Sequence, residues 1–335
     1  MSANTTNTMS SEEFKEIVES LNTSNYSFAN EMLYLICQTR PDILNADQTV
    51  LAGKIEMVGR IYAASPERRS YSSKDCQKEI DSSVILHDYG DGQGGFFTAL
   101  VKNLPFDNDF DISCQYCVQD NFVFDLSIPD LELLYHSIRM VLRFNQMIKH
   151  ATIKADKADE KEAAENLVVK NQISFCSKFL HFHFPNHVFI IDSYSSAGSS
   201  HLFPAKNYKY HLGKEATNIK GWLLLDAAFE GIDNAIFQNK VSERISYIQN
   251  LLDKNNNLKT NNNENIGTGK NQDVTENAYT QHAIRAYLAC CLLQKTGIIP
   301  SNQIKEFNSC MPPINSYPRL ADCVLMNIKP APKPK

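Results

Sequence analysis

The fold of this chain is decided by residues 174–193, SFCSKFLHFHFPNHVFIIDS. The first half has the composition of a buried helix, which we expect to end at Pro185 because proline cannot continue a helix. Four apolar residues, 188–191, then lead directly into Asp192 and a serine-rich stretch. An acid at this position is expected to begin the next helix, where backbone N–H groups and the helix dipole keep a carboxylate ionised.

A carboxylate that is fixed, ionised and half-buried has a chemical use. It can stabilise the positive charge that develops on a sugar when a glycosidic bond breaks. The alternative is that Asp192 only caps a helix. Lys178 likewise could be a site residue, or a lysine whose stem lies along an apolar surface. The nearby histidines do not predict a metal site, because His181 and His183 point to different faces of a helix. We therefore expect no metal and no other cofactor.

This stretch resembles the catalytic segment of helix-hairpin-helix DNA glycosylases, in particular the 8-oxoguanine-glycosylase-fold branch of bacterial proteins. The positions that carry the resemblance are Ser177, Lys178, Leu180, His181, Phe182, Pro185, Asp192 and Ser193. A second stretch, residues 51–69, resembles an early helix of the same branch. The resemblance implies an all-α, helix-hairpin-helix glycosylase-like bundle. It also implies base excision in which Asp192 activates water and Lys178 assists.

The expected substrate is double-stranded DNA with a base flipped out of the stack, because an interior acid cannot reach a stacked base. Aromatic and polar side chains near Asp192 would contact that base. The predicted substrate-binding residues are Gln172, His181, Ser193, Tyr194 and Trp222.

Two departures from the family pattern affect the mechanism. Residues 166–173, which correspond to the family's glycine-rich phosphate-binding hairpin, contain no glycine. Residues 172–174, where bifunctional members carry a lysine that forms a Schiff base, contain no lysine. We therefore expect a monofunctional enzyme that uses water. Two alternatives stay open: an N-glycosidase that acts on a free nucleoside or nucleotide, and a non-catalytic nucleic-acid-binding protein.

Charge is distributed unevenly along the chain. The net charge is −5, yet residues 1–135 carry −12 and residues 136–335 carry +7. Nucleic-acid binding needs a basic face rather than a basic whole. Lysines alternate with tyrosines after Asp192, a pattern that suits contact with a nucleic-acid backbone, although a solvated loop has the same composition. The predicted DNA contacts are Lys170, Lys206, Lys209 and Lys214.

Hydrophobic periodicity predicts an all-α protein with a minor irregular or β portion around residues 84–126. Helices are expected at 11–38, 49–64, 130–152 and 279–293, with two more within 221–252. A strand is considered within 114–126. The predicted regions are an acidic N-terminal helical region (1–135), a catalytic helical region (136–253), a flexible polar linker (254–273) and a C-terminal helical segment (274–328) that packs on the same core.

Composition bounds the class of protein. Hydrophobic residues make up 43% and charged residues 21%, which is ordinary for a globular protein. Nine scattered cysteines suit a reducing compartment, and the lone Cys114-x-x-Cys117 pair is a weak metal or redox signal. The chain has no apolar run of about 18 residues and no signal-peptide pattern. We therefore expect a cytoplasmic monomer with no membrane contact.

Overall fold

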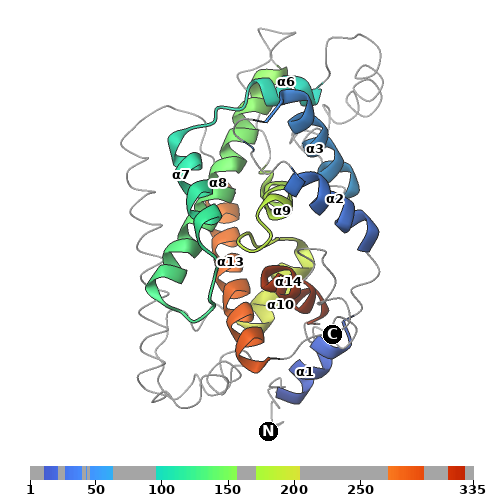
Figure 1. Cartoon of the computed structure of the whole chain (residues 1–335), viewed down its shortest axis with the longest axis vertical. Helices are drawn as coiled ribbons and strands as arrows, with labels where there is room; N and C mark the ends of the chain where they lie inside the picture. The colour runs from blue at the N-terminus through green and yellow to red at the C-terminus, as the bar shows by residue number, and fades with distance from the viewer. Residues whose placement is uncertain are drawn as a thin grey trace.

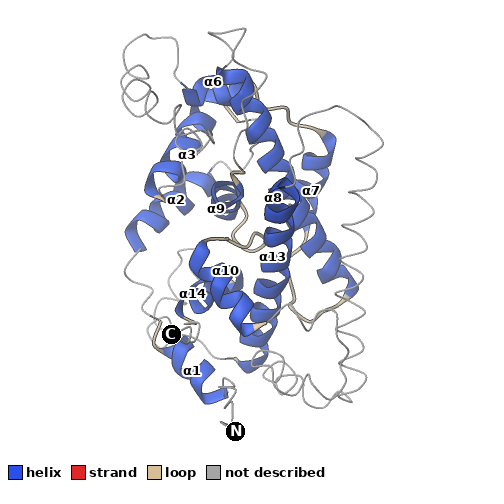
Figure 2. Ribbon diagram, turned by 180° about the vertical axis from the view of Figure 1, so that it is seen from behind, coloured by secondary structure: helices blue, strands red, loops and turns tan. Residues whose placement is uncertain are grey.

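The structure is a computed structural model of the chain, and it describes residues 11–21, 27–39, 43, 46–62, 96–156, 171–203, 271–297 and 316–328. Ten helices account for most of these residues, and no strand occurs among them (Figure 2). The predicted all-α class is therefore confirmed. The helices are α1 (Ser11–Glu19), α2 (Ser27–Thr39), α3 (Gln48–Ile61), α6 (Phe96–Lys102), α7 (Asn108–Gln119), α8 (Ile128–Asp156), α9 (Ile173–His183), α10 (Ser193–Leu202), α13 (Asn271–Thr296) and α14 (Tyr317–Asn327).

Several helices lie where the sequence predicts them. α8 covers the predicted 130–152, α3 covers the predicted 49–64 as far as Ile61, and α9 ends at His183, just before Pro185. The predicted 11–38 contains two helices, α1 and α2, rather than one. α13 begins at Asn271, so the end of the predicted linker 254–273 is helical. The rest of that linker and the helices predicted within 221–252 lie outside the described residues.

The strand considered within 114–126 is wrong. Residues 108–119 form α7, whose N-terminus is capped by Asp107, a residue that accepts a hydrogen bond from the amide of Phe110 at 3.0 Å. Phe110, Cys114 and Cys117 are buried at helical spacing on one face of α7. The weak alternation of apolar residues here therefore reflects a helix followed by an irregular segment, 120–127, without strand pairing among the described residues.

α9 lies at the centre of the described fold, in contact with α2, α3, α8 and α13 (Figure 1). On one side of α9 are α2, α3 and α6, and on the other are α10, α13 and α14. The long helix α8 contacts α6, α7, α9 and α13 and so connects the two sides. A catalytic group at the end of α9 would therefore lie where several helices converge.

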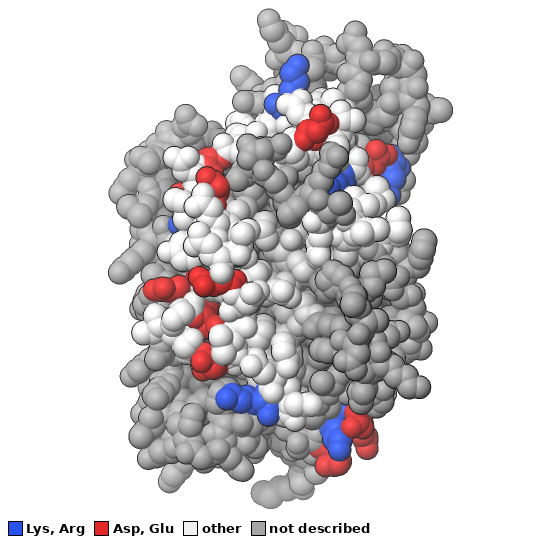
Figure 3. Space-filling model, in the orientation of Figure 1, with Lys and Arg blue, Asp and Glu red and all other residues white. Residues whose placement is uncertain are grey.

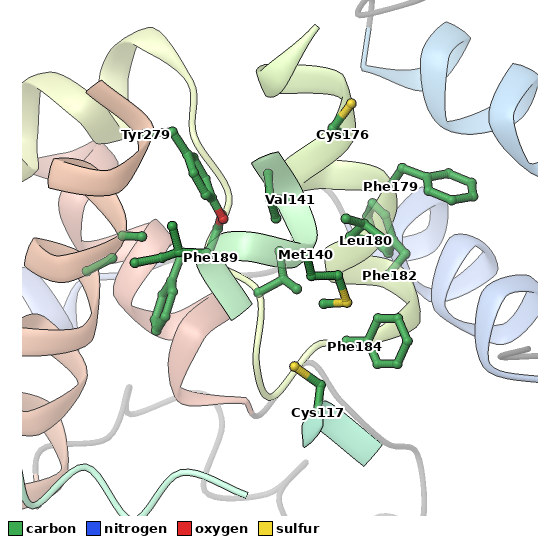
Figure 4. Packing of buried hydrophobic residues seen from close by; sticks show 14 of the residues in the cluster. Cys117, Met140, Val141, Cys176, Phe179, Leu180, Phe182, Phe184, Phe189 and Tyr279 are labelled. Atoms are coloured by element: carbon green, nitrogen blue, oxygen red, sulfur yellow. The ribbon is translucent and has the colours of Figure 1, made fainter. Parts of the chain in front are cut away.

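Every residue of α9 except Ser174 is buried. Its phenylalanines, among them Phe179 and Phe182, enter one continuous core (Figure 4). Phe144 of α8 stacks on Phe179 with ring centroids 5.2 Å apart. Burying one such side chain stabilises the fold by roughly 1.5–3 kcal/mol. This helix is apolar on all sides because it is surrounded by other helices, and its few polar groups must find partners inside the protein.

α10 and α14 pack backbone to backbone at Gly198. A Cβ atom at this position would lie 1.8 Å from the carbonyl oxygen of Leu325, so no larger residue fits without a shift of the helices. This close approach brings the middle of α10 and the last turn of α14 together. Residues from both helices therefore contribute to the site described next.

Candidate functional site

The apolar segment between α9 and α10 is extended but belongs to no sheet. Buried side chains of other helices hold its backbone in place of strand pairing. Successive carbonyl groups accept hydrogen bonds as follows: His187 from Ser137, Val188 from His181 (2.7 Å), Phe189 from Tyr279 (3.2 Å) and Ile190 from His282 (2.7 Å). The amide of Ile191 donates to the hydroxyl of Ser177 at 3.2 Å. The backbone is thus fixed at each residue that leads to Asp192.

Two of these partners are neutral histidines. The Nδ1 atom of His181 donates to the carbonyl of Val188, so its Nε2 accepts from the hydroxyl of Tyr34 at 2.6 Å. The Nε2 atom of His282 donates to Ile190. Burial lowers the pKa of His181 to about 3 and that of His282 to about 4. Both rings are therefore uncharged near neutral pH and act as rigid hydrogen-bonding groups.

Asp192 occupies the N-cap of α10, as the sequence predicts. Its Oδ1 accepts hydrogen bonds from the amides of Tyr194 (2.9 Å) and Ser195 (2.8 Å). The hydroxyl of Ser195 accepts in return from the Asp192 amide at 3.2 Å, which completes a capping box. The side chain is half-buried, and no described residue hydrogen-bonds its Oδ2. The carboxylate is therefore fixed through Oδ1 by the first turn of α10.

A buried cation lies on the helix that leads to this segment. Lys178 of α9 is only 6% exposed, and its ammonium donates to the hydroxyl of Ser174 at 2.9 Å. The same ammonium lies 5.5 Å from the ring centroid of Tyr62, within the range of a cation–π interaction. The hydroxyl of Tyr62 donates to the amide oxygen of Asn30. Lys178 is thus held between α9 and α3 and is not a surface lysine.

α14 contributes an ion pair to the surroundings of Asp192 and Lys178. The Arg319 guanidinium donates to Asp322 at 2.5 Å, and Asp322 is 3% exposed. Burial raises the pKa of Asp322 to about 6; the Arg319 charge opposes this rise, the Asp192 charge adds to it and the Lys178 charge opposes it. Four charged side chains from α9, α10 and α14 therefore form one electrostatic group, which we call the charged cluster: Lys178, Asp192, Arg319 and Asp322.

The remaining predicted site residues fall into three places. Ser193 and Tyr194 are exposed in the first turn of α10, with Tyr194 74% exposed, so both are accessible next to Asp192. His181 and Gln172 are buried; the ring of His181 is bonded within the protein, and the backbone N–H of Gln172 donates to the side-chain oxygen of Asn145 at 2.8 Å. The ring of His181 is therefore occupied within the protein, whereas the buried side-chain Nε2 of Gln172 has no hydrogen-bond partner among the described residues. Outside the described residues lie Lys170, Lys206, Lys209, Lys214 and Trp222.

Sequence analysis missed Arg319 and Asp322. A signal was present, because the two charges are three residues apart in a stretch whose neighbours Leu320, Val324 and Leu325 are apolar. Opposite charges at this spacing on the apolar face of a helix indicate a buried pair rather than a solvated one. Tyr62 lies within the second stretch that resembles the glycosylases, but its proximity to Lys178 depends on the fold.

Metal and membrane signals are absent from the part of the chain that the structure describes. Within it, no three His, Cys, Asp or Glu side chains are grouped to hold a metal ion, and no helix has the length and apolarity needed to cross a membrane. Cys114 and Cys117 are buried in α7, where burial raises the pKa of the Cys117 thiol. Comparisons with known protein families, with curated proteins and with solved structures gave no match.

Proposed function

We propose that this protein is a DNA glycosylase that hydrolyses the N-glycosidic bond of a flipped damaged or modified base. The observation that carries the proposal is the state of Asp192. Two amides fix one carboxylate oxygen, the preceding backbone is locked by buried side chains, and the other oxygen has no described partner. A helix cap needs only the first of these properties. The other two are what a preorganised catalytic carboxylate requires.

The chemistry follows from charge. As the bond between the sugar and the base lengthens, positive charge develops on the deoxyribose ring. The Asp192 carboxylate stabilises that charge, and its second oxygen orients a water molecule toward C1′ and accepts its proton. A group that stabilises transition-state charge in this way contributes about 10²- to 10³-fold to the rate.

Lys178 supplies a positive charge that the fold keeps largely out of solvent. Its ammonium is fixed by Ser174 and the Tyr62 ring, and electrostatic interactions are stronger in such a site than in water. In this proposal Lys178 stabilises negative charge on the departing base or on a neighbouring phosphate. The Arg319–Asp322 pair adds polar groups to the charged cluster but no net charge.

DNA is the proposed substrate because of the family resemblance and the positive balance of residues 136–335. The phosphate contacts are assigned to Lys170, Lys206, Lys209 and Lys214. Tyr194, exposed beside the cap, is the aromatic side chain best placed to stack on a base. None of these observations identifies the excised base, so the test uses many different bases.

The test is a substrate screen with a mass-spectrometric readout. The protein is incubated with duplex DNAs that carry a panel of damaged and modified bases, and in parallel with the matching free nucleosides. Release of a base from DNA but not from its nucleoside supports the proposal. Release from the nucleoside alone assigns the protein to the free-nucleoside glycosidases. DNA binding without release of any base from the panel would contradict the proposal and favour a binding protein.

A further inference from the structure

α7 and the segment after it form an unusually apolar surface. Five of the ten large hydrophobic side chains that are exposed among the described residues lie here, whereas the other five are spread over α2, α3 and α10. The five are Ile112 (47%), Tyr116 (42%), Val118 (73%), Val123 (56%) and Ile128 (50%). A concentration of this kind marks an interaction site more often than a solvated surface.

The same surface is acidic. Five aspartates that are not buried lie on α7, at its ends or on the segment after it (Asp107, Asp109, Asp111, Asp120 and Asp125), and acidic side chains gather on this side of the molecule (Figure 3). Arg139 pairs with Asp109, and Arg143 pairs with Asp107. No described cation pairs with the carboxylates of Asp111, Asp120 or Asp125. We call this surface, α7 with residues 120–128, the acidic face. Its charge repels a nucleic-acid backbone and attracts a basic partner.

A cavity of about 240 Å³ opens at the edge of the acidic face. Its apolar walls are Phe122, Phe124, Tyr317 and Pro318, and Asn121 and Asn186 add amide groups. Sites for small-molecule ligands usually measure about 300–1,000 Å³, whereas a cavity of about 150 Å³ already holds a benzene molecule. The volume therefore fits one large apolar side chain better than a cofactor or nucleotide.

The wall of this cavity is held in a strained conformation. Phe124 (φ 55°) and Leu126 (φ 62°) lie in the left-handed region, which costs roughly 1–3 kcal/mol for each bulky residue. Buried Asp130 accepts hydrogen bonds from the amides of Val123 (2.8 Å) and Phe124 (2.6 Å) and from the hydroxyl of Tyr287 (2.8 Å). The surrounding fold thus fixes the segment before any partner arrives, which lowers the entropic penalty of binding.

We propose that the acidic face docks a basic segment of a partner protein, which inserts one apolar side chain into the cavity. The cavity holds the anchor, and Asp120 and Asp125, on the segment that supplies three of the cavity residues, attract the basic side chains on either side. The exposed Val118 and Val123 extend the apolar contact. This proposal does not depend on the glycosylase activity. The partner protein would bind the acidic face, whereas DNA needs a basic surface and would bind elsewhere on the molecule.

The test uses the full chain and a short synthetic peptide of lysines and arginines around a single phenylalanine. Its control is the same peptide with serine in place of phenylalanine, and binding is followed by fluorescence anisotropy. The phenylalanine peptide should bind roughly tenfold or more tightly than the serine peptide, because burying a phenylalanine contributes about 1.5–3 kcal/mol. Equal binding of the two peptides, or no binding of either, would overturn the proposal.

Variants locate the binding surface. Asn121→Trp should fill the exposed mouth of the cavity and remove the advantage of phenylalanine, and Asp120→Lys should weaken both peptides through charge repulsion. Leu35→Ser, at a side chain 59% exposed on α2, is the matched control and should bind as the parent does. Displacement of the peptide by duplex DNA would contradict the proposal. Self-association that Val118→Ser abolishes would assign the face to a second copy of the chain.

Discussion

Asp47 and Asp192 begin two helices with the same pattern of side-chain hydrogen bonds, although only Asp192 forms a capping box. The Oδ1 atom of Asp47 accepts from the amides of Thr49 (2.9 Å) and Val50 (3.2 Å), and that of Asp192 accepts from the two corresponding amides of α10 (2.9 and 2.8 Å). The surroundings differ. Asp47 is exposed, whereas Asp192 is half-buried and acts electrostatically on Asp322 and His282. The hydrogen bonds of a cap are therefore a local property. The electrostatic surroundings of the cap carboxylate are set by neighbours far away in the sequence.

The comparison extends to ion pairs. Arg60 and Glu56 on α3 form a surface pair 2.8 Å apart whose side chains are 38% and 31% exposed. Arg319 and Asp322 on α14 form a pair with 13% and 3% exposure. Solvent screens the Arg60–Glu56 pair, so it contributes little to the free energy of unfolding. Removing one partner of the Arg319–Asp322 pair would leave an uncompensated charge inside the protein. The predictions that follow test whether the charged cluster differs from these surface counterparts as the geometry indicates.

The largest effect is expected on stability. Arg319→Met should lower the free energy of unfolding by roughly 3–5 kcal/mol, because it leaves Asp322 buried without its cation. Arg60→Met is the control and should cost less than about 1 kcal/mol. Urea denaturation of both variants at neutral pH gives the two values. Equal losses would mean that the α14 pair is as well solvated as the α3 pair.

Asp192→Asn should reduce base release about 10²- to 10³-fold while the protein stays folded, because asparagine also caps helices well. Asp47→Asn alters a cap of the same bonding outside the charged cluster and should leave the rate unchanged. The readout is release of the base identified in the substrate screen, with circular dichroism as the check on folding. Full activity in folded Asp192→Asn would reduce this residue to a helix cap.

Acid should destabilise the protein through the histidines that hold the segment before Asp192. His181 and His282 have folded-state pKa values of about 3 and about 4, below the value of about 6.5 expected in the unfolded chain. Each therefore stabilises the fold above pH 6.5, and this contribution is lost as the pH falls toward the folded-state pKa. Between pH 7.5 and 5 the loss is about 2 kcal/mol per histidine.

Asp322 works in the opposite direction over the same range. Its folded-state pKa of about 6 exceeds that of an unfolded aspartate, so protonation near pH 5 stabilises the folded form. The losses from two histidines exceed the gain from one aspartate, so urea denaturation should show lower stability at pH 5 than at pH 7.5. Asp322→Asn should steepen this loss, whereas a variant with an unchanged pH dependence would show that Asp322 does not titrate in the folded protein.

The smallest expected effect is the absence of a covalent adduct. No lysine occupies residues 172–174, and Lys178 is held more than one helical turn further along by Ser174 and the Tyr62 ring. Borohydride added during turnover should therefore trap no protein–DNA cross-link. A cross-link that disappears in Lys178→Ala would instead establish a Schiff-base mechanism and would change the role of Asp192.

Part of this architecture could be predicted from local patterns. The helix that ends before Pro185, the cap at Asp192 and the long helix over 130–152 each depend on residues close together in the chain. The strand considered within 114–126 failed because exposed Val118 and Val123 imitate alternation, while the burial of Phe110, Cys114 and Cys117 follows helical spacing. α14 lies within the predicted C-terminal helical segment 274–328 but was not predicted as a separate helix, since one short helix gives few periods from which to recognise it.

The sequence by itself determined the all-α class and the position of Asp192 at the start of a helix, because both follow from hydrophobic period and capping chemistry over a few residues. Only the tertiary structure decided that His181, Tyr279 and His282 would hold the segment before Asp192, and that Lys178, Arg319 and Asp322 would share its surroundings. The physical reason is burial. A polar group inside the core must find a partner, and that partner is supplied by whichever helix packs there: 92 residues away for His282 and Ile190, and 147 residues away for Tyr34 and His181, beyond the reach of any local pattern.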